Sequence, residues 1–269
     1  MPAPDWIPRL VALDIDETLL RPGLGISPAV RSAVHRVVRA GTEVVLATGR
    51  TALGTRPIVA GLGLAAGHVL CSNGSVRLDA ATGEAVHMTP FDPGPVLHRL
   101  AELLPGAVFG AELVGIGNLV TAHFGAYGLT GEFLAGLDEV ANARTPRLTV
   151  WWPGRNAEEM NELVADLELP GASFTVDHVH AWLTAVAPGV SKGGALEQLR
   201  TELKVPVDST MAVGDGYNDV EMLRWAAHGV AMGQAPPDVR AVADEVTGTV
   251  QEDGLVTALD RWFSLPAAG

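Results

Sequence analysis

Three short clusters of polar residues each follow an apolar run in this 269-residue chain. Residues 14–18 (DIDET) follow the run RLVAL, residues 48–50 (TGR) follow EVVLA, and residues 214–219 (GDGYND) follow TMAV. Apolar runs of this length are typical of strands buried in a parallel sheet. Ligands of open parallel sheets bind outside the carboxyl ends of the strands. We therefore expect the three clusters to lie together at one edge of a sheet.

The first and third clusters contain four aspartates, Asp14, Asp16, Asp215 and Asp219. Carboxylates a few ångströms apart cannot all stay ionised without a counter-charge. Oxygen ligands favour a hard cation, and protein-bound Mg²⁺ typically takes one or two carboxylates, waters and a substrate phosphate. A single such aspartate would usually be only a turn or helix-cap residue. Two clusters at strand ends instead indicate a Mg²⁺ site that receives a phosphate group.

Lys192 supplies a basic group that could join these acids. It follows Ser191 at the start of an expected helix. A cation at a helix N-terminus opposes the helix dipole by about 0.3–1 kcal/mol, which a nearby anion would offset. By its position alone, Lys192 could equally be an exposed lysine with its ammonium group in water.

The elements around the clusters alternate between strands and helices. Apolar runs predict strands over residues 9–13, 43–47, 68–71, 210–213 and 229–232. Helical spacing of apolar residues predicts helices after Ser27, around 51–60, after Ser191, through Met222, after Pro236 and over 255–263. Such alternation is typical of an α/β fold with a doubly wound parallel sheet, of the Rossmann-like kind.

The middle of the chain has a different pattern. Strands are expected in pairs, over residues 108–116, 119–124, 147–152, 173–176 and 181–187. Helices are expected to begin after Asp92 and at Asn156, where Glu159 completes a capping box. We therefore predict a discontinuous core domain, residues 1–84 and 184–269, interrupted by an inserted α+β cap domain at 85–183.

The composition excludes several classes of partner. The chain has 18 Lys and Arg against 31 Asp and Glu, a net charge of −13, which argues against nonspecific binding of nucleic acid or anionic membranes. No run of 18 apolar residues predicts a membrane span, and Cys71 alone cannot form an intrachain disulfide. With no recognisable signal peptide, we expect a cytoplasmic protein. Its oligomeric state cannot be read from the sequence.

Four motifs occur in the order and spacing of the haloacid dehalogenase (HAD) superfamily: DIDETLL, ATGR, GVSKGGAL and GDGYNDVEML. The chain most resembles the Cof-type phosphatases of that superfamily. The insert after SNGS (72–75) resembles their α/β cap in position and approximate size. The resemblance implies a Mg²⁺-dependent phosphoric monoester hydrolase that acts on a small phosphorylated metabolite, such as a sugar phosphate.

The resemblance also implies catalytic roles, position by position. Asp14 resembles the nucleophile that forms an aspartyl-phosphate. Asp16 resembles the general acid that protonates the leaving oxygen and later activates water. Thr18 resembles the hydroxyl that steadies this loop. Lys192 resembles the lysine that bridges the nucleophile and the phosphoryl oxygens.

Binding roles follow from the same resemblance. The implied phosphoryl contacts are Thr48, the Gly49 backbone, Lys192 and Asn218. The implied Mg²⁺ ligands are Asp14, the backbone carbonyl of Asp16, and Asp215. Asp219 resembles a partner of the lysine or of the groups around the metal. Two positions depart from the family pattern: Glu17 replaces a common glycine, and Gln234 replaces a common asparagine.

Two alternatives to a phosphatase stay open at this point. A sugar phosphomutase of the same superfamily would return the phosphoryl group to a sugar and release no free phosphate. A non-catalytic sensor of phosphorylated metabolites would bind tightly without turnover. The presence of Asp16 argues against a sensor, because binding alone needs no general acid.

Overall fold

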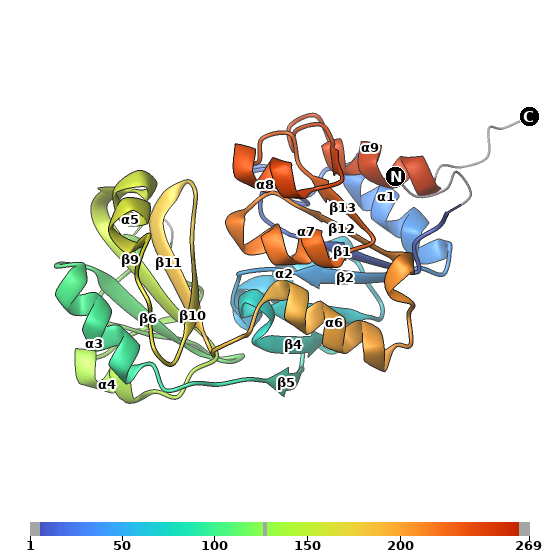
Figure 1. Ribbon diagram of the computed structural model, residues 1–269. Helices are drawn as coiled ribbons and strands as arrows, with labels where there is room; N and C mark the ends of the chain where they lie inside the picture. The colour runs from blue at the N-terminus through green and yellow to red at the C-terminus, as the bar shows by residue number, and fades with distance from the viewer. Residues whose placement is uncertain (1–5, 126–127, 264–269) are drawn as a thin grey trace, which may run out of the picture. The chain divides into compact units, whose positions relative to one another are not determined.

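The computed structural model of the protein describes residues 6–125 and 128–263 (Figure 1). Contacts within the chain divide it into two compact units. The first unit consists of Met1–Thr48, Ala60–Leu70 and Lys192–Gly269, and the second of Gly49–Val59 and Cys71–Ser191. The exact ends of the predicted insert, at residues 85 and 183, stay a prediction.

The first unit is built on a parallel sheet with the strand order β14-β13-β12-β1-β2-β3. The strands are β1 (Leu10–Leu13), β2 (Glu43–Ala47), β3 (His68–Cys71), β12 (Thr210–Gly214), β13 (His228–Ala231) and β14 (Glu245–Val246). Strand β1 lies between β12 and β2 and is buried along its whole length, as expected of a strand covered on both faces. The predicted parallel sheet is confirmed.

Helices cover this sheet. They are α1 (Pro28–Arg39), α6 (Lys192–Glu202), α7 (Val220–Trp225), α8 (Pro237–Val242) and α9 (Gly254–Phe263). Helix α2 (Ala52–Leu62) begins in the second unit and ends in the first. Leu10 and Ala12 of β1 share an apolar core with Leu196 of α6, Met222 of α7 and Val239 of α8. Helix α1 contacts β2 and packs beside α9 (Figure 1). Helices thus pack on both faces, and the doubly wound class is confirmed.

The second unit has a largely antiparallel sheet with the order β10-β11-β9-β6-β7-β8. Its strands are β6 (Val108–Leu113), β7 (Gly117–Val120), β8 (Glu132–Leu134), β9 (Leu148–Asn156), β10 (Ser173–Val176) and β11 (His180–Val186). The helices α3 (Gly94–Leu103), α4 (Leu137–Asn142) and α5 (Ala157–Val164) contribute to the core on one face. A hairpin of β4 (Val76–Asp79) and β5 (Ala85–Met88) also belongs to this unit.

Caps and turns fix the ends of several elements. The Ser27 hydroxyl accepts a hydrogen bond from the Val30 amide and so caps α1, and the capping box of Asn156 and Glu159 begins α5 as predicted. Tryptophans 151 and 152 point to opposite faces of β9. Trp152 lies in the helix-covered core, whereas Trp151 stacks on Phe124 with ring centroids 6.2 Å apart.

Three strand predictions were wrong in their bounds by more than one residue. The strand predicted over 108–116 ends at Leu113, and the strand predicted over 119–124 is the shorter β7. Gly115 has a φ of +74°, and the Ile116 amide donates to the Leu113 carbonyl at 2.9 Å, so the chain turns here. The strand predicted over 147–152 continues to Asn156 as β9. The short elements β4, β5, β8, β14 and α4 were not predicted.

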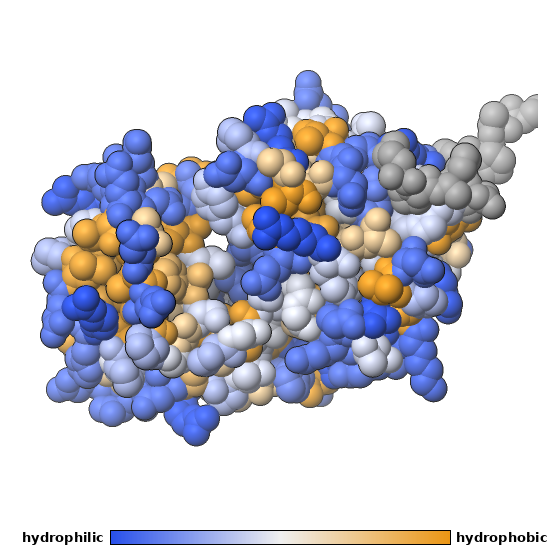
Figure 2. Space-filling view, in the orientation of Figure 1, coloured by the Kyte–Doolittle hydropathy of each residue, from blue (hydrophilic) through white to orange (hydrophobic). Residues whose placement is uncertain are grey.

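The surface agrees with the acidic composition. On the face drawn in Figure 2, hydrophilic residues are spread over both units, and smaller apolar patches lie among these residues. None of the helices within the described ranges combines the length and apolar character that a membrane span requires.

Candidate active site

The ends of the central strands position the first group of acids. Asp14 directly follows β1, and its amide donates to the Val213 carbonyl of β12 at 3.0 Å. Asp215 directly follows β12. Since β1 and β12 are neighbouring parallel strands in register, their carboxyl ends lie side by side. The predicted meeting of the DIDET and GDGYND clusters is therefore found in the structure.

Lys192 lies at the centre of these acids. Its side chain is fully buried, and its Nζ atom donates to Asp14 Oδ1 and to Asp219 Oδ1, both at 2.6 Å. Burial by itself lowers the pKa of Lys192, but the two carboxylates outweigh this effect and raise it. The residue is therefore a buried cation, and the alternative of an exposed surface lysine is wrong.

Asp219 uses both of its oxygens to hold the site together. Oδ1 binds Lys192, and Oδ2 accepts from the backbone amides of Asp215 and Gly216, each at 2.9 Å. A side chain at Gly214 would place its Cβ 2.6 Å from Asp219 Oδ2, so only glycine allows this approach. The carboxylate thus fixes the loop that carries Asp215.

The buried acids are short of positive charge. One carboxylate oxygen from each of Asp14, Asp215 and Asp219 lies within 4.8 Å of the other two. Burial raises the pKa of Asp14 to about 8, although Lys192 acts in the opposite direction. Burial, followed by the charges of Asp14, Asp219 and Glu17, raises the pKa of Asp215 to about 9. A further cation would offset this crowding.

The donor set fits a hard divalent cation. It offers only oxygen ligands, which suit Mg²⁺ better than soft metals. Thr18 Oγ1 donates to Asp215 Oδ1 at 3.2 Å and so orients that carboxylate. Because both Asp219 oxygens already accept hydrogen bonds, Asp14 and Asp215 are the better placed carboxylates of the cluster.

The remaining predicted residues occupy three environments. Thr48 directly follows β2 and is fully buried. Asp16 is exposed and forms an isolated bridge with Leu20. Asn218 is half-buried in a single 3₁₀ turn over Tyr217–Asp219. Gly49 is the first residue of the second unit. The catalytic and binding roles of these residues stay predictions.

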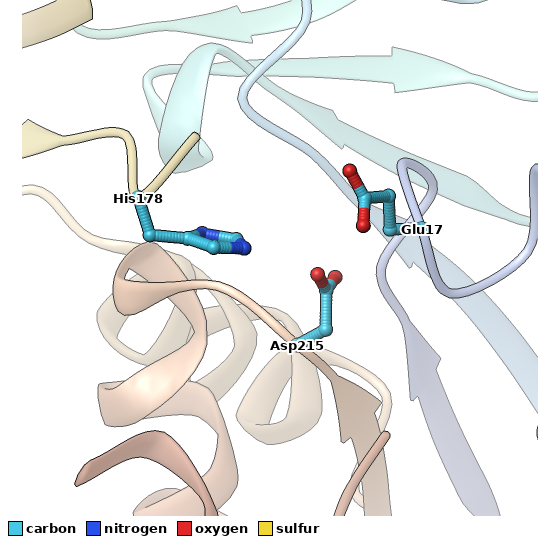
Figure 3. A group of neighbouring side chains, drawn as sticks. All are labelled: Glu17, His178 and Asp215. Carbon is cyan, nitrogen blue, oxygen red and sulfur yellow. The ribbon is translucent and has the colours of Figure 1, made fainter. Parts of the chain in front are cut away.

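The two departures from the family pattern are connected. Glu17 has a φ of +57°, a left-handed conformation that explains why glycine is common there. The Gln234 side chain donates to the Glu17 carbonyl at 2.6 Å and accepts from the Val250 amide at 3.0 Å. Figure 3 shows the Glu17 carboxylate facing Asp215; one oxygen of each lies within 4.8 Å of the other. The sequence alone gives Gln234 no role, and its departure from asparagine is the available signal.

A comparison with protein families agrees with this geometry. A model of the haloacid dehalogenase-like hydrolases matches residues 11–106 and 154–259. The chain belongs to the haloacid dehalogenase-like hydrolase family. The family that the motifs indicated is thereby confirmed.

Relatives within this family have nearly the same length. The chain is 28% identical over 277 residues to the HMP-PP phosphatase of Serratia proteamaculans, with 96% of each chain covered. It is 26% identical over 264 residues to the 5-amino-6-(5-phospho-D-ribitylamino)uracil phosphatase YcsE of Bacillus subtilis, covering 94% of this chain and 95% of that one. BT1666 from Bacteroides thetaiotaomicron, a solved structure among the HAD phosphatases, matches with a TM-score of 0.79 at 26% identity, covering 97% of both chains. This chain is accordingly a phosphatase of the haloacid dehalogenase-like family.

Proposed function

We propose that this enzyme hydrolyses a phosphate monoester of a small organic metabolite through an aspartyl-phosphate on Asp14. The observation that carries the proposal is the buried Lys192 ammonium, which binds Asp14 and Asp219 at 2.6 Å beside the ends of β1 and β12. The choice of a small metabolite rests on the substrates named for the two relatives, HMP-PP and a phosphoribitylaminouracil.

The proposed reaction has two displacements at phosphorus. First, an oxygen of the Asp14 carboxylate forms a bond to phosphorus while the bond to the leaving alkoxide breaks, and Asp16 gives that alkoxide a proton. Next, Asp16 takes a proton from water, whose oxygen attacks phosphorus and displaces Asp14 to release inorganic phosphate. Lys192 reduces the repulsion between Asp14 and the phosphoryl oxygens in both steps. Thr48, the Gly49 backbone and Asn218 are the proposed phosphoryl contacts.

We assign the metal to Asp14, Asp215 and the backbone carbonyl of Asp16. Burial and the neighbouring acids raise the pKa values of Asp14 and Asp215, and a cation bound between them would offset this crowding, which supports the assignment. When bound, Mg²⁺ would neutralise phosphoryl oxygens as charge shifts in the transition state. Asp219 then acts by holding Lys192 and the Asp215 loop.

Mg²⁺ is expected to raise the melting temperature, and more at pH 8 than at pH 6. In the folded metal-free protein, Asp14 and Asp215 keep their protons up to a pH of about 8 or 9, whereas in the unfolded chain they lose them near their ordinary pKa of 3.8. The stability of the metal-free protein therefore falls as the pH rises toward 8 or 9. Mg²⁺ replaces these protons, and at 100 times its Kd it adds about 2.7 kcal/mol, which corresponds to several degrees. Differential scanning fluorimetry measures the shift. Asp215→Asn should abolish most of it; an unchanged melting temperature at both pH values contradicts the assignment.

Release of free phosphate tests the proposed function. The purified protein is assayed against an aryl phosphate and a panel of phosphorylated metabolites, with Mg²⁺ or with EDTA. We expect phosphate release from at least one compound in Mg²⁺ and loss of release in EDTA. Isomerised sugar phosphate without free phosphate would identify a mutase, and tight binding without turnover would identify a sensor; either outcome contradicts the proposal. Action on a small metabolite in the cytoplasm, without nucleic acid or membrane partners, is the corresponding cellular prediction.

A further inference from the structure

A buried glutamate in the second unit takes no part in the proposed reaction. Glu112 of β6 is only 1% exposed. Its backbone amide donates to the Arg147 carbonyl at 3.0 Å, and its carbonyl accepts from Thr145 Oγ1 at 2.9 Å. Since both backbone groups are bound, the strand holds the backbone of Glu112 in a fixed position.

The Glu112 carboxylate closes a ring of hydrogen bonds between three distant segments. Oε1 accepts from the Ala52 amide at 2.8 Å, and Oε2 accepts a short hydrogen bond from the Ser72 hydroxyl. The Ser72 amide in turn donates to the Arg50 carbonyl at 2.8 Å. Residues 50–52, Ser72 and Glu112 are thus joined in one closed circuit.

Each partner in the ring needs an acceptor or a restraint. Ala52 is the first residue of α2, so its amide has no acceptor within the helix. The nearby Thr51 Oγ1 accepts from the Gly54 amide and not from Ala52. Ser72 and Asn73 have φ values of +52° and +54°, in the left-handed region that non-glycine residues seldom adopt. Such conformations persist only where the surroundings determine them, and here Glu112 and Arg50 bind Ser72.

Burying the Glu112 carboxylate away from water costs free energy. Burial raises the pKa of Glu112, while hydrogen bonds from Ser72 and Ala52 and the charge of Arg147 partly oppose the rise. An apolar side chain would fill the site without this desolvation cost, but it would leave the Ala52 amide and the Ser72 hydroxyl without their acceptor. The hydrogen bonds, rather than packing, are therefore what distinguishes a carboxylate here.

We propose that Glu112 is a positioning residue that fixes the segment 50–52 and thereby the Gly49 amide one residue before it. This inference rests on the proposed function, which assigns the Gly49 backbone to the phosphoryl group. Glu112 itself touches no reacting atom. Its effect passes through the ring to the peptide that directly follows Thr48 in the chain.

Three variants test the ring. Glu112→Ala removes both acceptors, Ser72→Ala removes one hydrogen bond, and Glu112→Gln keeps an acceptor for Ala52 and offers Ser72 a donor. We expect Glu112→Ala to lower kcat/KM for an aryl phosphate by about 10²-fold, because moving a substrate-positioning group by about an ångström can reduce the rate by that factor. Ser72→Ala should lower it less, and Glu112→Gln should restore most of the activity. Hydrogen exchange should speed up in a peptide covering 49–56 in both alanine variants, and stay unchanged over β9.

A matched control separates positioning from general stability. Val150→Ala creates a cavity in the helix-covered core of the same sheet. It should lower the melting temperature without changing kcat/KM or hydrogen exchange over 49–56.

The inference is wrong if Glu112→Ala keeps wild-type kcat/KM, or if Glu112→Gln is as impaired as Glu112→Ala. If Glu112→Ala does not fold, the same comparison is made with Ser72→Ala and Glu112→Gln. A wild-type protein that releases no phosphate refutes the proposed function instead, and the exchange data still show whether Glu112 fixes the segment.

Discussion

We expect Asp14→Asn to abolish phosphate release while the fold stays intact. Asparagine has the shape of aspartate but cannot form the acyl phosphate, and loss of a nucleophile lowers kcat by roughly 10⁴–10⁶-fold. The variant should be folded and at least as stable as the wild type without metal. The reason is that burial raises the pKa of Asp14 to about 8, which means that this site favours a neutral side chain.

Two measurements check this result. Phosphate release is followed with an aryl phosphate in Mg²⁺, and the melting temperature is recorded in EDTA. Asp138→Asn makes the same acid-to-amide change at an exposed position in the first turn of α4, and should leave turnover unchanged. Full activity of Asp14→Asn would refute the covalent mechanism. A large fall in its melting temperature would show that the Asp14 charge stabilises the metal-free fold.

We expect Lys192→Met to have the second large effect, on stability as well as on turnover. Lys192 is the cation bound to Asp14 and Asp219, and all three side chains are buried. Removing one partner of a buried ion pair typically destabilises a protein by about 3–5 kcal/mol. The loss should be larger at pH 8 than at pH 5. Burial raises the pKa of Asp14 to about 8, so a stranded Asp14 takes up a proton at low pH, whereas at high pH it remains charged and uncompensated.

Urea unfolding at the two pH values measures this loss. Adding Asp219→Asn to Lys192→Met should recover part of the stability, because it removes one of the stranded charges. Lys204→Met changes the exposed lysine that follows α6 and is the matched control, with little expected effect. Equal stability of Lys192→Met and the wild type at both pH values is the outcome that contradicts this account.

Residues close together in the chain made much of the fold predictable. The strands β2 and β3 coincide with their predicted bounds, because a strand buried on both faces is apolar over nearly its whole length. The bounds of the half-buried β10 were also predicted correctly. Ser27 and Asn156 were recognised as helix caps because a cap binds an amide only three residues away. The exposed strand β5 was missed, since it buries no face that would impose a pattern.

The pairing of polar side chains was decided by tertiary structure. Lys192 binds Asp14 across 178 residues of sequence, and Glu112 binds Ala52 across 60. The position of Lys192 at a helix start does not by itself distinguish it from an exposed lysine. An acid inside the apolar run of β6 was the one sign that Glu112 differs.

The sequence by itself determined that acids follow the ends of buried parallel strands, because hydrophobic periodicity and cap chemistry act over a few neighbouring residues. Only the tertiary structure decided that Lys192 is buried between two carboxylates, that both Asp219 oxygens are bound, and that Gln234 supports the left-handed Glu17. The physical reason is that these contacts form between segments brought together by packing. Their charges, burial and hydrogen bonds exist only once the sheet has assembled.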